Sequence, residues 1–104
     1  MSIVKKYFPK KKVCRVTFKL DTGEMDDPKK VFLVGEFNDW DLEVTRMRRV
    51  KGGIFSVSLE LPPGTIYQFR YLIDGSRWEN DDAADDYLPS PYGSDNSVVV
   101  IDNN

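Results

Sequence analysis

The stretch TIYQFRYLIDGSRW, residues 65–78, decides the fold class of this chain. Large apolar side chains occupy every second position over residues 67–73, and polar side chains such as Gln68 and Arg70 stand between them. A period of two is typical of a β-strand that buries one face. The Asp74-Gly75 pair that follows is typical of a tight turn. The segment therefore predicts a strand that ends in a turn, with Arg70 on the face directed away from the core.

Alternation of this kind, or a short apolar run, recurs along the chain, and no helical stripe is present. The further strands that we expect cover residues 13–20, 31–35, 46–51, 54–61 and 98–101. Gly52-Gly53 joins two of them in a hairpin, and long polar loops fill residues 21–30 and 80–97. Short strands separated by turn residues predict an all-β protein, an antiparallel β-sandwich without a second domain.

Composition narrows the classes of function. A length of 104 residues suits one domain with its own core, and the sequence contains no apolar run long enough to span a membrane and no apolar signal-peptide segment. We therefore expect a cytoplasmic protein. Cys14 is the only cysteine and lies in an alternating run, so we expect it in the core. The lack of histidine excludes the usual zinc sites and histidine-dependent triads, and we expect no metal, no cofactor and no enzymatic activity.

Charge is distributed unevenly. Residues 1–20 contain seven basic and no acidic side chains, whereas residues 74–104 contain eight acidic side chains and one arginine. Two solvated surfaces that attract each other, within one chain or between chains, would explain this pattern. A basic arm at residues 1–12 for nucleic acid or anionic lipid is the other interpretation. No binding motif accompanies the arm, so we expect neither partner and assign residues 13–104 to the domain itself.

Two tryptophans lie beside predicted turns. Trp40 follows Asn38 and Asp39, which favour a turn at the surface; the alternative is that Trp40 is a core residue at the end of a strand. For Trp78, the register of the hairpin determines whether the indole points to solvent or into the core. A three-residue loop pairs Trp78 with Leu72 and directs the indole outward, whereas a two-residue loop directs it into the core.

Polar groups near these indoles suit a ligand rich in hydroxyls. Arg70 is either a solvated charge or a planar set of donors for hydroxyl oxygens. The segment of residues 92–97, which contains Tyr92, Ser94 and Asn96, is either a plain loop or the second wall of a shallow groove.

Acidic residues are plentiful between residues 81 and 86. The acids of this segment, Asp81, Asp82, Asp85 and Asp86, do not have the spacing of a calcium loop, and we expect a solvated acidic turn. Nothing in the sequence places two carboxylates on opposite sides of a pocket, as glycoside hydrolysis requires.

Three motifs carry a family resemblance. VFLVGEFNDW (residues 31–40) resembles the strand-and-turn signature of the glycogen-binding domain in the AMP-activated protein kinase beta subunit. YQFRYLIDGSRWEND (residues 67–81) and LPSPYGSDNSVVV (residues 88–100) resemble the second signature and the closing loop and strand of that family. The resemblance covers residues 13–101 and extends to the glycogen- and starch-binding early-set domains of isoamylases and glucan-branching enzymes.

The resemblance implies an immunoglobulin-like antiparallel β-sandwich that binds α-1,4-linked glucan without catalysis, together with the longer hairpin loop. The positions that match the binding residues of the family are Trp40, Arg70, Trp78, Tyr92, Ser94 and Asn96. Arg70 stands where lysine is common, and Tyr92 and Asp95 change the loop. The resemblance also suggests glycogen-metabolising enzymes as partners, and the charge segments suggest a homo-oligomer. The alternative function is that of a protein-docking module that has lost sugar binding.

Overall fold

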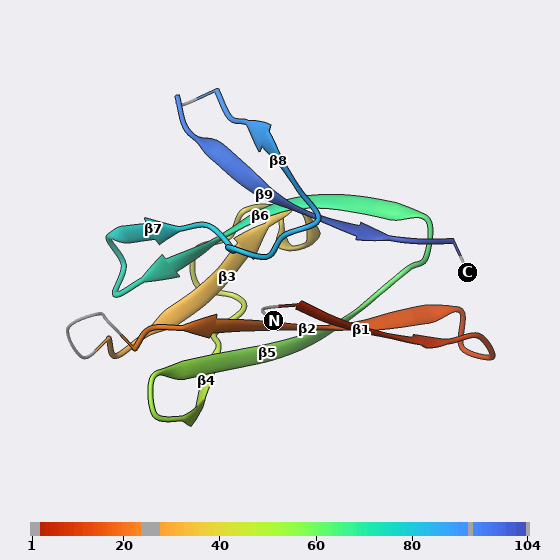
Figure 1. Cartoon of the computed structure of the whole chain (residues 1–104), viewed down its shortest axis with the longest axis horizontal. Helices are drawn as coiled ribbons and strands as arrows, with labels where there is room; N and C mark the ends of the chain where they lie inside the picture. Colours follow the sequence, from red (N-terminus) through yellow and green to blue (C-terminus); the bar gives the residue numbers. More distant parts are fainter. Residues whose placement is uncertain (1–2, 24–27, 92, 104) are drawn as a thin grey trace.

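The computed structural model describes residues 3–23, 28–91 and 93–103, which form two antiparallel sheets in separate layers (Figure 1). The four-stranded sheet consists, in spatial order, of β1 (Ile3–Phe8), β2 (Val13–Asp21), β5 (Ile54–Leu61) and β4 (Arg48–Lys51). The five-stranded sheet consists of β3 (Val31–Gly35), β6 (Thr65–Ile73), β9 (Asp95–Ile101) and β8 (Asp86–Pro89), with β7 (Arg77–Glu79) paired to β6. The predicted immunoglobulin-like sandwich is confirmed.

The core lies between the sheets and is built from the alternating positions that the sequence indicates. Phe18 of β2 and Phe69 of β6 are fully buried, with ring centroids 5.1 Å apart, and Tyr71 packs on Phe69 at 5.7 Å. Cys14 is fully buried, as expected, and burial raises the pKa of its thiol. Within the described residues no helix has the length and apolar character needed to cross a membrane.

Residues 3–8, part of the predicted basic arm, form the edge strand β1. Ile3 is buried opposite Phe18 of β2, so the strand contributes to the core. Lys5 lies on the same side of β1, and its Nζ is 2.7 Å from Oδ2 of Asp85, which precedes β8 in the other sheet. One contact between the basic and the acidic segment is therefore made inside the chain. The sequence did not predict this strand, because Lys5 and Lys6 interrupt the alternation of apolar and polar residues in β1.

Two predicted elements have different bounds in the structure. The predicted strand 46–51 begins at Arg48, because Arg46 instead forms a bridge with Phe32 of the other sheet. The predicted loop 80–97 contains β8 and the first residues of β9. In both places the chain pairs with a strand that is distant in sequence, which local patterning does not reveal.

Candidate functional site

An open groove of about 750 Å³ lies over the outer face of the five-stranded sheet. Its lining comes from β3, η1 (Glu36–Asn38), β6, β7, β9 and the loops beside them. The lining residues are Val34, Glu36, Trp40, Leu42, Gln68, Arg70, Trp78, Ser90, Pro91 and Asn96. Four of the six residues matched by the resemblance are in this set, and the groove brings them together from four separate segments.

A compact turn places Trp40 at one side of the groove. After β3 the chain makes the 3-10 turn η1, and Asp39 and Trp40 then adopt left-handed backbone angles, with φ of 56° and 57°. The side chain of Asn38 holds this turn, because its Oδ1 accepts from the Gly35 N–H at 3.0 Å and its Nδ2 donates to the Leu33 carbonyl at 2.8 Å. The Trp40 indole is 38% exposed, which confirms the predicted turn position.

The turn that carries Trp40 is anchored in the core on its other side. The Phe37 ring lies 5.6 Å from the rings of Phe18 and Tyr67. Gly35 has no space for a side chain, since an added Cβ would lie 2.6 Å from the Gln68 carbonyl oxygen and 2.7 Å from Cβ of Phe69. The motif of residues 35–40 therefore has three parts. Gly35 allows the close approach of β6, Phe37 anchors the turn in the core, and Trp40 presents its indole to solvent.

Trp78 lies on the same face of the sheet as Arg70. The hairpin between β6 and β7 has the longer loop, with Ile73 paired to Arg77 and Leu72 to Trp78. Paired residues share a sheet face, so the indole points outward and is 41% exposed. The register implied by the resemblance is thereby confirmed, and both indoles line one groove.

Arg70 stands on the floor of the groove within a hydrogen-bond network. Its Nε donates to Asn96 Oδ1 at 2.6 Å, and its Nη2 donates to Ser94 Oγ at 2.6 Å and to Ser90 Oγ at 3.3 Å. Nη1 donates to none of the described residues. Three partners hold the plane of the guanidinium, so the side chain is not the freely solvated charge of the alternative interpretation.

Asn96 supports Arg70 from β9. The residue is only 7% exposed, and its Nδ2 donates to Gln68 Oε1 at 3.0 Å. Gln68 in turn donates its backbone N–H to Glu36 Oε1 at 2.7 Å. These bonds join β9, β6 and η1 in one polar floor. Tyr92, the remaining residue implied by the resemblance, lies outside the described residues.

Sequence reasoning missed part of the groove. Leu42 is 48% exposed beside Trp40, and Glu36, Gln68, Ser90 and Pro91 complete the wall and floor. For Gln68 a signal was present, because it shares the outward face of its strand with Arg70. Leu42 lies in an irregular segment, where no period indicates the direction of a side chain.

The prediction that Asp81 belongs to a solvated acidic turn is wrong. Asp81 is 1% exposed, and its Oδ2 accepts from the Tyr71 hydroxyl at 2.6 Å while its backbone N–H donates to Ser97 Oγ at 2.8 Å. Burial, followed by the negative charge of Asp81, raises the pKa of Tyr71, so the phenol stays protonated and donates. Among the described residues no group of three or more metal-ligating side chains is placed to hold an ion.

Comparison with known proteins gives consistent matches. The family model described as the glycogen recognition site of AMP-activated protein kinase matches residues 10–104. Protein PTST homolog 2, chloroplastic, of Arabidopsis thaliana is 31% identical over 71 residues, and Protein FLOURY ENDOSPERM 6, chloroplastic, of Oryza sativa subsp. japonica is 35% identical over 71 residues. Each match covers 68% of this chain and 12% of the relative, so the chain spans a small part of the length of these proteins.

The names of these relatives contradict the expectation of a cytoplasmic protein. Both relatives are chloroplastic by name, whereas the expectation placed this chain in the cytoplasm. The expectation had rested on the lack of an apolar signal-peptide segment, and plastid transit peptides have no such segment. The feature used for the prediction therefore could not distinguish the two compartments.

Proposed function

Because this chain belongs to the family of glycogen recognition sites of AMP-activated protein kinase, we propose that its groove binds an α-1,4-linked glucan without catalysis. Carbohydrate binding is the function of that family. In this chain, the two tryptophans and Arg70 would hold the sugar.

The observation that carries the proposal is the pair of half-exposed indoles in one groove, with a fixed polar floor between the segments that hold them. Trp40 and Trp78 would stack on the apolar faces of sugar rings, which removes apolar area of both partners from water. The groove is open, so the stacked rings remain accessible to a long polymer and not only to a chain end.

Arg70 would supply the directional contacts. Its Nε and Nη2 are used within the protein, so the N–H groups of Nη1 are the ones offered to sugar hydroxyls. Asn96 acts mainly by positioning Arg70, because its Oδ1 already accepts from the guanidinium. Ser94 has the same positioning role, and Tyr92 is assigned to the groove by the resemblance alone.

The chemistry of the groove favours binding over hydrolysis. Among the described residues that line it, Glu36 carries the only carboxylate, and that carboxylate accepts the backbone N–H of Gln68. Glycoside hydrolysis uses two carboxyl groups on either side of the scissile bond. The groove therefore serves as an attachment site for a glucan.

One groove of this kind should bind weakly, since an open surface excludes little water and the hydroxyls lose hydration on binding. Repeated sites on one polysaccharide would strengthen attachment if several copies of the chain act together. A homo-oligomer and glycogen-metabolising enzymes are accordingly the partners that we propose, and a plastid is the proposed location.

The test is a fluorescence titration with maltoheptaose, with a β-1,4-linked oligosaccharide for comparison. Trp40→Ala and Trp78→Ala should each weaken binding about tenfold or more, because each removes most of one stacking surface. Ile66→Ala is the matched control: Ile66 lies on the outward face of β6, 60% exposed, and does not line the groove. If the wild-type chain ignores millimolar maltoheptaose, the protein-docking function replaces this proposal.

Docking has less support in the structure than glucan binding. It would use the basic and acidic segments as the interface, and Lys5 and Asp85 of these segments already pair with each other inside the chain. The paired charges are less available to a partner, whereas the groove presents its indoles to solvent.

A further inference from the structure

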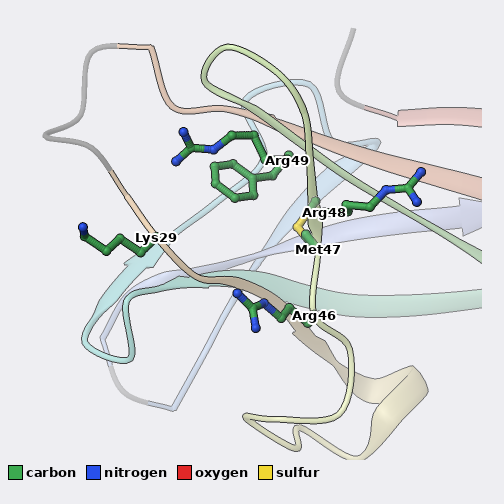
Figure 2. A pocket seen from close by; sticks show the side chains of 6 residues that line it. Lys29, Arg46, Met47, Arg48 and Arg49 are labelled. Atoms are coloured by element: carbon green, nitrogen blue, oxygen red, sulfur yellow. The ribbon is translucent and has the colours of Figure 1, made fainter.

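A concave basic pocket of about 570 Å³ lies at the edge of the sandwich, where the chain passes from one sheet to the other between β3 and β4 (Figure 2). Four of its lining residues are cationic and none is acidic. The lining consists of Lys29, Arg46, Met47, Arg48, Arg49 and Phe55. The proposed glucan groove shares no lining residue with this pocket.

The backbone that carries these cations is well fixed. Met47 is buried and donates its N–H to the Val31 carbonyl at 2.7 Å, and Arg46 forms a bridge with Phe32. Because neighbours on an extended strand point to opposite sides, the burial of Met47 directs Arg46 outward. In the segment before β3, the Lys29 N–H donates to Asp74 Oδ1 at 2.9 Å.

Arg49 is held by two contacts of its own. Its guanidinium lies 5.2 Å from the centre of the Phe55 ring, and its Nη2 donates to the Pro28 carbonyl. In Figure 2 the side chains of Lys29, Arg46 and Arg49 lie on one side of the backbone of residues 46–49, and that of Arg48 lies on the other side. Lys29 and Arg49 also take part in other interactions. Arg46 is exposed and has no ionic partner among the described residues.

We propose that this pocket is a second binding site of the chain and that it takes a phosphate group. Arg46 adds an exposed guanidinium, without an ionic partner among the described residues, to a concavity whose described lining contains no acid, and positive potential in such a concavity attracts a compact dianion. Planar guanidinium groups match the geometry of phosphate oxygens through paired N–H donors. The concave shape favours a small anion over an extended acidic protein segment, which would need a flat or elongated surface.

The sheet register connects this pocket with the groove. Arg46 is opposite Phe32, Phe32 is opposite Leu72, and Leu72 is opposite Trp78. These residues form one row across the outer face, and neighbouring strands are spaced so that the Cα atoms of Arg46 and Trp78 lie about 14 Å apart. A phosphate ester on a glucan in the groove could therefore reach the pocket; this source of the phosphate, unlike the pocket itself, rests on the proposed function.

The test is a calorimetric titration of the whole chain with inorganic phosphate at low ionic strength. Arg46→Gln should weaken binding about tenfold, because a charge-assisted contact is lost. Lys51→Gln is the matched control: it removes one positive charge from the exposed strand β4, but Lys51 does not line the pocket, and the affinity should change little. The proposal is overturned if wild type does not bind millimolar phosphate, if both variants lose affinity equally, or if oligoglutamate displaces phosphate more effectively than sulfate does.

A second titration identifies the source of the phosphate. Maltoheptaose that carries a phosphate ester should bind wild type more tightly than plain maltoheptaose, and Arg46→Gln should abolish the difference. Equal affinities, together with binding of inorganic phosphate, would assign the pocket to free phosphate. Trp40→Ala should weaken binding of plain maltoheptaose but leave binding of inorganic phosphate unchanged. A wrong assignment of the groove and a wrong assignment of the pocket therefore give different results.

Discussion

The two tryptophans of the groove are equally exposed but are held in different ways. The Trp40 turn is stabilised by the side chain of Asn38, whose bonds reach residues only three to seven positions away. Trp78 lies on the short strand β7, and the bonds that fix its flanks join residues 10 to 45 positions apart. Both indoles rest on the sandwich, since Phe37 anchors the Trp40 turn in the core, but the side-chain hydrogen bonds of Asn38 are local, whereas those beside Trp78 reach distant strands.

The long-range support of Trp78 follows β7 directly. Asn80 Oδ1 accepts from the backbone N–H and the hydroxyl of Ser97, and Asn80 Nδ2 donates to the Asp95 carbonyl. Asp81 then bonds to Tyr71 and Ser97 in the interior. Together these contacts attach the end of β7 to β9 and β6, so the position of Trp78 depends on three strands.

Removal of the buried hydrogen bond between Asp81 and Tyr71 should have the largest effect on stability. Asp81→Ala should lower the free energy of unfolding by about 3 kcal/mol, because the Tyr71 hydroxyl would be left buried without its charged acceptor. Urea denaturation measures this change. Asp102→Ala, an exposed aspartate after β9, serves as control and should alter stability by less than about 0.5 kcal/mol. Equal losses for the two variants would contradict the assigned role of Asp81.

Loss of the local support should cost less. Asn38→Ala removes the acceptor for the Gly35 N–H and the donor to the Leu33 carbonyl, and should lower the free energy of unfolding by about 2 kcal/mol. Asn38→Asp retains the acceptor but not the donor, so its loss should be intermediate in the same denaturation experiment.

A measurement of glucan binding by Asn38→Ala separates its effect on stability from its effect on the binding groove. Under conditions where Asn38→Ala is fully folded, its affinity for maltoheptaose should still fall, because the left-handed Trp40 backbone is no longer held by the turn. An unchanged affinity would mean that Trp40 keeps its place without Asn38, and the contrast between local and long-range support would then fail.

This contrast also explains what the sequence could predict. Asn38 and Asp39 signal a turn by their own chemistry, and the alternation over residues 67–73 signals a strand, so the sandwich and the position of Trp40 followed from local patterns. The orientation of Trp78 did not, because a one-residue change of register reverses it. The register is set by contacts with residues far away in the sequence.

The same reason accounts for the features that the sequence analysis missed. Asp81 was expected in solvent as part of an acidic turn, and its partner Tyr71 is on another strand. Arg46 was assigned to a continuous strand, although its bridge is to Phe32 in the other sheet. Leu42 joins the groove from an irregular segment. Each of these three features depends on contacts between segments distant in sequence, so local patterns could not reveal it.

The smallest predicted effect concerns the hairpin loop before Trp78 and its dependence on pH. Oδ1 of Asp74 accepts from the backbone N–H groups of Lys30 and Lys29 at 2.8 and 2.9 Å, and these bonds lower the pKa of the carboxyl group. Since the folded pKa lies below the unfolded value of about 3.9, the carboxylate stabilises the fold above that value. The contribution is lost as the pH falls through the folded pKa.

Asp74→Asn keeps the amide oxygen as an acceptor and tolerates the left-handed backbone of residue 74, with φ of 51°, but it no longer titrates. The free energy of unfolding of wild type should therefore fall more steeply than that of the variant as the pH drops from about 5 to 3. Urea denaturation at a series of pH values measures both slopes. Parallel slopes would show that the carboxylate does not fasten this loop to residues 29 and 30, which would leave Asn80 and Asp81 as the long-range support of Trp78.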